Sequence, residues 1–114
     1  MVWWGCAMVD VCGQGGRIGG NMRENRIEQQ LCHAVRRQGG IALKLASPSY
    51  AGLPDRLVLL PGGHMAFVEV KAPGRKPRAL QYTRLEHLAR LGFRVYVLDE
   101  SGKIGGMIRE IQAS

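Results

Sequence analysis

The feature that most constrains the fold is a three-residue turn, Pro61-Gly62-Gly63, between two apolar runs. Residues 56–60 (RLVLL) precede the turn and residues 65–71 (MAFVEVK) follow it, and both runs are rich in residue types that favour β-strands. A short glycine-containing turn of this kind joins antiparallel strands. The sequence therefore predicts a β-hairpin.

The register of this hairpin brings two carboxylates together. If all three turn residues lie between the strands, Leu60 pairs with His64. The same register places Asp55 opposite Glu69, and opposed residues in a hairpin project to the same face. Lys71, two positions after Glu69, projects to that face too. A slip of one residue would leave Asp55 diagonal to Glu69. In either register, two carboxylates and one ammonium group converge near the end of the hairpin.

The segments around the hairpin predict an α/β domain. Apolar side chains at helical spacing favour a helix before it, and Pro77 and Gly92 suit the two ends of a helix after it. The predicted elements are a helix at 24–37, a strand at 41–46, the hairpin, a helix between Pro77 and Gly92, a strand at 94–99, and a short helix or irregular tail at 103–112. This order predicts a single domain with a mixed sheet.

The first 21 residues differ from the rest of the chain. Six of the 16 glycines fall there, and no helical or strand period runs through the segment. We interpret residues 1–21 as a flexible leader or a non-native extension. Residues 22–114 then form the folded domain.

Cysteine usage and hydropathy predict a cytoplasmic protein. Cys6, Cys12 and Cys32 are odd in number and lack zinc-type spacing, so we expect free thiols in a reducing compartment. The N-terminus lacks the basic region of a signal peptide. No run of 18 or more apolar residues is present, so we expect no membrane partner.

The charge of the chain favours a polyanionic partner. Sixteen Lys and Arg residues against nine Asp and Glu residues give a net charge of +7 over only 114 residues. Nucleic acid is the first candidate and an anionic membrane the second, while a solubilising excess of charge is the alternative. Residues 71–94 hold seven basic residues and one acidic residue. They are expected either to contact phosphates without reading sequence or to form a solvated helix face.

The carboxylates at the hairpin suit a Mg²⁺ site. Mg²⁺ keeps several waters and typically takes one or two protein carboxylates, here Asp55 and Glu69, plus a substrate phosphate. The backbone carbonyl of Val70 is a further candidate ligand. Lys71 would orient a water or neutralise charge on a phosphate. The alternative is a plain turn and a solvated strand edge, but Glu69 interrupts an apolar strand and would be costly to bury without a partner.

These residues resemble a known nuclease signature. Pro54-Asp55 followed by Glu69-Val70-Lys71 is similar to the PD-(D/E)XK pattern, and the surrounding sequence resembles the VRR-NUC (virus-type replication-repair nuclease) branch over about residues 24–100. The resemblance implies a restriction-endonuclease-like core: a helix, a three-stranded sheet containing the hairpin, a helix and a strand. It also implies DNA cleavage that depends on Mg²⁺ or Mn²⁺.

The resemblance also implies roles for individual residues. Asp55 and Glu69 would bind the metal and Lys71 would be the catalytic lysine. An acidic residue of the first helix completes such sites. Glu28 is the match and Glu24, one turn earlier, is the competing candidate. Gln81 would hydrogen-bond a metal ligand, a water or a phosphate. The candidate DNA-binding residues are Arg75, Lys76, Arg78, Arg84, Lys44 and Ser47.

The resulting hypothesis is a phage-type endonuclease, encoded by a phage or a bacterial prophage, that cuts branched DNA such as four-way (Holliday) junctions. A chain this small is expected to act as a homodimer, which places two sites on two strands. No nucleotide cofactor is expected, because the sequence lacks a P-loop and a GxGxxG motif at a strand-to-helix junction. A monomeric flap or nicking nuclease is one alternative, and a non-catalytic basic DNA-binding module is another.

Overall fold

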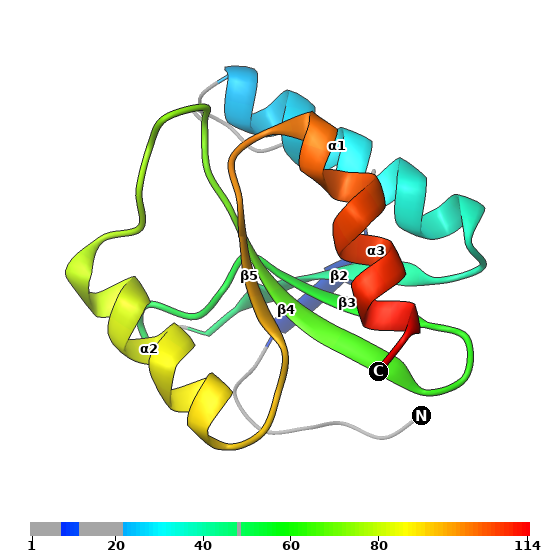
Figure 1. The fold of residues 1–114 in the computed structure, drawn as a ribbon. Coiled ribbons are helices and arrows are strands. Elements are labelled where there is room, and N and C mark those ends of the chain that lie inside the picture. The colour runs from blue at the N-terminus through cyan, green and yellow to red at the C-terminus, as the bar shows by residue number, and fades with distance from the viewer. Residues whose placement is uncertain (1–7, 12–21, 48) are drawn as a thin grey trace.

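The computed structural model describes residues 8–11, 22–47 and 49–114 and has the predicted α/β architecture (Figure 1). Helices flank a mixed sheet. The elements are β1 (Met8–Val11), α1 (Met22–Arg37), β2 (Ile41–Ala46), β3 (Arg56–Leu60), β4 (His64–Val70), α2 (Ala79–Arg90), β5 (Val95–Leu98), the short 3-10 helix η1 (Ser101–Lys103) and α3 (Ile104–Gln112). Every helix and strand predicted from the sequence is therefore confirmed.

The predicted hairpin register is also confirmed. The strands lie in the order β1-β2-β3-β4-β5, with antiparallel pairing as far as β4 and parallel pairing between β4 and β5. Leu60 pairs with His64, and the pairing continues to Arg56 opposite Val68. One further step along both strands places Asp55 opposite Glu69, as the three-residue turn requires.

Element boundaries differ slightly from the predictions. The second helix begins at Ala79 rather than at Pro77, with Arg78 as its N-cap. Gly92 follows the helix with a φ of +101°, a conformation that glycine adopts without strain. The segment at 103–112, which was left open between a helix and a tail, forms α3. It folds as a helix because four of its apolar residues find a place in the core, namely Ile104, Met107, Ile108 and Ile111.

The sequence predicted no strand before the first helix, and β1 is an addition to the expected sheet. Met8–Val11 pairs antiparallel with β2, with Val9 opposite Leu45. The open edge of β2 offers backbone donors and acceptors to any short extended segment that can reach it. The rest of residues 1–21 lies outside the described residues, so the interpretation of that segment as a leader or an extension stays a prediction.

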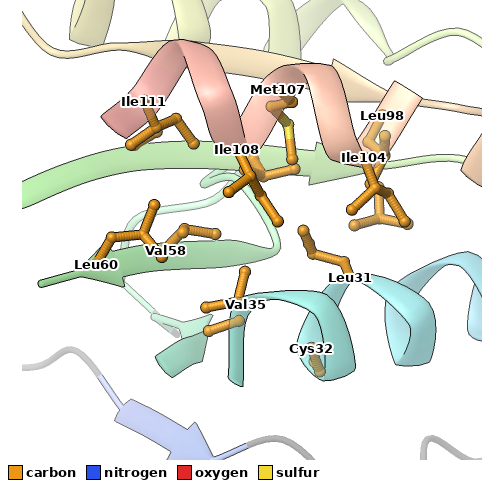
Figure 2. Close-up of a cluster of buried hydrophobic side chains, with 14 of the residues drawn as sticks. Leu31, Cys32, Val35, Val58, Leu60, Leu98, Ile104, Met107, Ile108 and Ile111 are labelled. Carbon is orange, nitrogen blue, oxygen red and sulfur yellow. The ribbon is translucent and has the colours of Figure 1, made fainter. Parts of the chain in front are cut away.

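The main core lies between the sheet and the pair α1 and α3 (Figure 2). Leu31 and Val35 from α1 meet Val58 of β3 and the apolar face of α3, and all three are fully buried. Burial alternates along β3, so Arg56, Val58 and Leu60 share the core-facing side. The residue pattern thus places one charged side chain, Arg56, on the apolar face of the sheet.

One prediction about the cysteines differs from the structure. Cys32 takes part in a disulfide, so the expectation that every cysteine is a free thiol is wrong for this residue. Cys6 and Cys12 lie outside the described residues. A buried cysteine on a core helix gives no sequence signal of its partner, because pairing depends on tertiary proximity. Among the described residues, no helix is both long enough and apolar enough to cross a membrane.

Candidate active site

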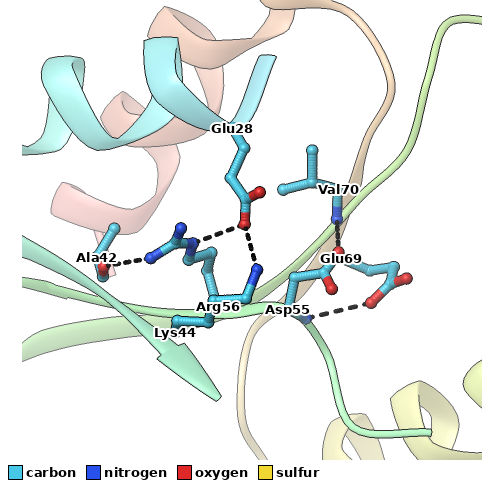
Figure 3. A network of polar contacts seen from close by, with 7 residues as sticks. All are labelled: Glu28, Ala42, Lys44, Asp55, Arg56, Glu69 and Val70. Carbon is cyan, nitrogen blue, oxygen red and sulfur yellow. Dashed lines mark hydrogen bonds and ion pairs between the residues drawn. The ribbon is translucent and has the colours of Figure 1, made fainter. Parts of the chain in front are cut away.

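The carboxylates of Asp55 and Glu69 each accept a hydrogen bond from a backbone N–H across the end of the hairpin (Figure 3). The Asp55 N–H donates to Oε1 of Glu69 at 3.2 Å, and the Val70 N–H donates to Oδ2 of Asp55 at 3.0 Å. Buried Pro54 comes immediately before Asp55. These two bonds, one in each direction between the strand ends, hold the two carboxylates next to each other, as the register predicts.

The second oxygen of Glu69 is held by two further side chains. Oε2 accepts a hydrogen bond from Nε2 of Gln81 at 2.8 Å and lies 3.1 Å from Nζ of Lys71. Gln81 is itself oriented, because its Oε1 accepts from the Arg78 N–H at 2.8 Å in the first turn of α2. The Glu69 side chain is only 1% exposed, whereas that of Lys71 is 17% exposed. Lys71 therefore lies between the buried carboxylate and the surface.

The electrostatics of this group fit a divalent cation. Burial first, and the neighbouring Asp55 carboxylate second, raise the pKa of Glu69 to about 7, although Lys71 acts in the opposite direction. Two carboxylates held together in a buried place repel each other, and a hard cation between such oxygens relieves that repulsion. The donor set therefore suits Mg²⁺ or Mn²⁺ at Asp55 and Glu69, with the Val70 carbonyl nearby along the chain.

Glu28 lies in a different ionic group. Its Oε2 accepts from Nε of Arg56 at 2.9 Å and from Nζ of Lys44 at 3.2 Å, and the residue is 5% exposed (Figure 3). Arg56 also donates to the carbonyl of Ala42 at 3.2 Å. In the described part of the chain, no three His, Cys, Asp or Glu side chains gather closely enough to hold a metal ion together. Through its ion pairs with Lys44 and Arg56, Glu28 joins α1 to β2 and β3 on the core-facing side of the sheet.

A basic pocket of about 330 Å³ opens beside Lys71. Its lining brings together residues from the loop after β4 and from the first turns of α1, namely Glu24, Lys71, Ala72, Arg75, Lys76 and Arg78. Arg75, Lys76 and Arg78, which were predicted to bind DNA, therefore lie next to Lys71, the candidate catalytic lysine. The carboxylate that α1 contributes to this pocket is that of Glu24, the competing candidate, rather than that of Glu28.

Arg84, another predicted DNA-binding residue, contacts the loop that leads to Asp55. Its guanidinium carbon lies 4.0 Å from the centre of the Tyr50 ring, and its Nε donates to the Ala51 carbonyl at 2.9 Å. Gly52, at a φ of +85°, passes so close to α2 that a Cβ there would lie 2.9 Å from Cγ of Leu80. Arg84 therefore ties this loop to the helix that carries Gln81.

The structure separates the remaining predicted residues from the pocket. Lys44 forms an ion pair with Glu28, and Ser47 begins the loop after β2, where its carbonyl accepts from the Tyr50 N–H at 3.4 Å. Sequence reasoning missed Arg56 altogether. The available signal was its place two residues before Val58 on the buried face of a strand, where a charge requires a partner.

Comparisons with known proteins identify the family of the chain. No family model matches the chain. A solved structure described as a VRR-NUC domain superposes with a TM-score of 0.73 and 30% sequence identity, over 78% of this chain and 97% of that one. The chain is 51% identical over 78 residues to "Putative nuclease p44" of Acyrthosiphon pisum secondary endosymbiont phage 1, an alignment that covers 68% of this chain and 84% of the relative. Sequence and fold together show that this chain belongs to the VRR-NUC family of nuclease domains.

Proposed function

We propose that this chain is a phage-type nuclease that hydrolyses DNA phosphodiester bonds with Mg²⁺, or alternatively Mn²⁺, held by Asp55 and Glu69. The observation that carries the proposal is the buried Glu69 carboxylate next to the half-buried Asp55 carboxylate, with Lys71 at 3.1 Å from Glu69 and a basic pocket beside it. A similar phage protein is named as a nuclease, which supports the same reaction class. When bound, the cation would stabilise charge on the phosphate and lower the pKa of a water.

The side chains of the chain itself do the positioning. Lys71, a point charge at the mouth of the pocket, faces the place where negative charge develops on the phosphate. Gln81 is a positioning residue, because it holds Glu69 without facing the pocket. Arg75, Lys76 and Arg78 bind the backbone of the substrate and fix its register.

The acidic residue that α1 supplies is proposed to be Glu24. It lines the Lys71 pocket, whereas the carboxylate of Glu28 is engaged by Arg56 and Lys44. Glu28, the first choice from the sequence, would bind a metal only if its ion pairs to Arg56 and Lys44 opened.

For the substrate we propose branched DNA, with four-way junctions first, cut by a homodimer in the cytoplasm of a bacterial host. A dimer of so small a chain would present two basic pockets to two strands. Strand β5 lies at the edge of the sheet, where a second copy has backbone groups to pair with. A monomeric flap or nicking nuclease and a non-catalytic DNA-binding module remain the rivals.

Product mapping on labelled four-way junctions, flaps and linear duplexes tests the proposal, with Mg²⁺, Mn²⁺ or EDTA. Paired symmetric nicks that require metal and disappear in Lys71→Ala support the dimeric resolvase. The matched control is Lys103→Ala, an exposed lysine paired with Asp99, which should cut as the wild type does. Single cuts at flaps would instead support the monomeric rival. DNA binding without cleavage under any metal would leave the non-catalytic module.

A further inference from the structure

A second pocket lies next to the Lys71 pocket, and the site described above does not use it. It has a volume of about 460 Å³, and its lining includes Arg23, Arg26, Gln30, Pro73 and Glu100. Two of these side chains are permanent cations and one is a carboxylate. The lining is therefore polar and carries an excess of positive charge.

The two pockets are neighbours along both stretches of chain that form them. The Lys71 pocket is lined by Glu24 and Ala72, and the second pocket by the adjacent residues Arg23 and Pro73. Figure 1 shows the loop after β4 rising beside the first turn of α1, with the connection from β5 to α3 close to the same helix. A chain-like ligand that leaves the Lys71 pocket across residues 72–73 therefore reaches the second pocket directly.

Helix geometry explains why α1 serves both pockets. Arg23, Arg26 and Gln30 fall on one side of the buried Ile27, and Glu24 falls on the other side. The helix thus turns an acidic side toward the proposed metal site and a basic side toward the turn that contains Glu100. Glu24 would thus lie near a bound cation, and Arg23 and Arg26 would lie near a bound anion.

We infer that the second pocket binds the sugar-phosphate backbone of the strand being cut, beyond the cleavage point, through Arg23 and Arg26. The inference rests on the proposed function, since it continues the path of the same strand. Guanidinium groups are the side chains best suited to phosphate oxygens. Such contacts set the register of the strand and carry no sequence preference.

Salt-dependent DNA binding tests the inference. Binding of a short fluorescent duplex to the full chain is measured in EDTA, so that no cleavage intervenes, over a series of KCl concentrations. Arg26→Ala should weaken binding several-fold and lower the slope of log affinity against log salt by about one. Glu100→Gln should tighten binding, because it removes a carboxylate from the path. The matched control is Arg37→Ala, an exposed arginine in the last turn of the same helix, away from both pockets.

A second experiment identifies which phosphate of the strand Arg26 contacts. One uncharged methylphosphonate link is moved along the strand, and its effect on the affinity is compared between wild type and Arg26→Ala. At one position beyond the cut, the neutral link should weaken wild type but not the variant. Equal effects in both proteins at every position, or equal losses in Arg26→Ala and Arg37→Ala, would overturn the inference. Absence of cleavage with any metal would defeat the proposed function alone, because the binding measurements need no catalysis.

Discussion

Glu28 and Glu69 are both buried glutamates, yet their surroundings differ in charge. Glu28 lies on the core-facing side of the sheet, where Arg56 and Lys44 approach the same carboxylate oxygen at 2.9 and 3.2 Å. Glu69 lies at the end of the hairpin, beside a second carboxylate and with Lys71 as its ion-pair partner. The Glu28 carboxylate is compensated by two cations, whereas burial first, and the acidic neighbour Asp55 second, raise the pKa of Glu69.

The difference between the two glutamates shows that burial of a carboxylate does not by itself identify a metal site. A buried charge that is paired on both sides stabilises one particular arrangement of elements. A buried carboxylate next to another carboxylate is costly unless something further is bound there. We therefore propose that Glu28 stabilises the fold and that Glu69 binds the cation.

The largest expected effect is on cleavage by Glu69→Gln. The variant keeps the size of the side chain, but it loses the charge proposed to hold the cation, and one of its two acceptor oxygens becomes a donor. Loss of several kcal/mol of charge stabilisation corresponds to a rate lower by about a thousand-fold. Single-turnover cleavage with saturating metal measures it. Glu28→Gln is the control, and its folded fraction should cut at nearly the rate of wild type.

Glu28→Gln, which should hardly change the cleavage rate, should instead lower the stability of the protein. Glu28→Gln leaves Arg56 buried without its anionic partner, so the free energy of unfolding should fall by about 3 kcal/mol. Urea unfolding measures the change. In the double variant Glu28→Gln/Arg56→Gln, part of the loss should return, because the buried guanidinium is removed as well and Lys44, which also loses Glu28, is partly exposed. A single variant as stable as wild type would show that the pair contributes nothing.

The shifted pKa of Glu69 predicts a pH dependence of the metal-free protein. Its pKa is about 7 in the folded state, whereas the ordinary value for a glutamate is 4.5. The folded state therefore binds the proton more tightly than the unfolded state does. Stability is then full below pH 4.5 and declines as the pH rises to about 7, by about 3 kcal/mol at most. Urea unfolding in EDTA at a series of pH values should show this decline in wild type. Glu69→Gln should lack it, and Glu28→Gln should keep it.

Gln81→Ala should have a smaller effect, since the residue acts through Glu69. Loss of the partner that orients a metal ligand typically lowers metal affinity or activity by about 10- to 100-fold. The deficit should shrink at high metal concentration, a dependence that a purely structural role would not produce. Metal-dependence curves of the cleavage rate make the distinction, with exposed Gln112→Ala as the control.

The smallest effect is expected for Arg84→Ala. The substitution removes the stack on Tyr50, worth about 1 kcal/mol, and the hydrogen bond to the Ala51 carbonyl. Thermal unfolding should shift slightly, and the cleavage rate should fall several-fold at every salt concentration. If Arg84 instead bound DNA directly, its loss would lower the salt slope of binding.

Sequence reasoning predicted the hairpin site because it depends on local rules. The turn at residues 61–63 determined the register, and alternation along the strands then placed Asp55, Glu69 and Lys71 on one face. Gln81 was a candidate through the family resemblance, and its hydrogen bond to Glu69 agrees with the contact to a metal ligand that the resemblance implied.

The sequence did not reveal which residues from distant elements meet. Helical spacing left Glu24 and Glu28 as two candidates one turn apart, and the choice between them depends on where the loop after β4 lies. Arg56 and Glu28 are separated by 28 positions, so no local pattern joins them. Pairing of β1 with β2 likewise depends on an edge that exists only in the folded sheet.

Calorimetric titration of Mn²⁺ into the metal-free protein tests most directly the proposal that Glu69, and not Glu28, binds the cation. Wild type and Glu28→Gln should bind the ion with similar affinity, and Glu69→Gln should bind it far more weakly. If Glu28→Gln lost the ion while Glu69→Gln kept it, the assignment of Glu28 to the fold and Glu69 to the cation would be wrong.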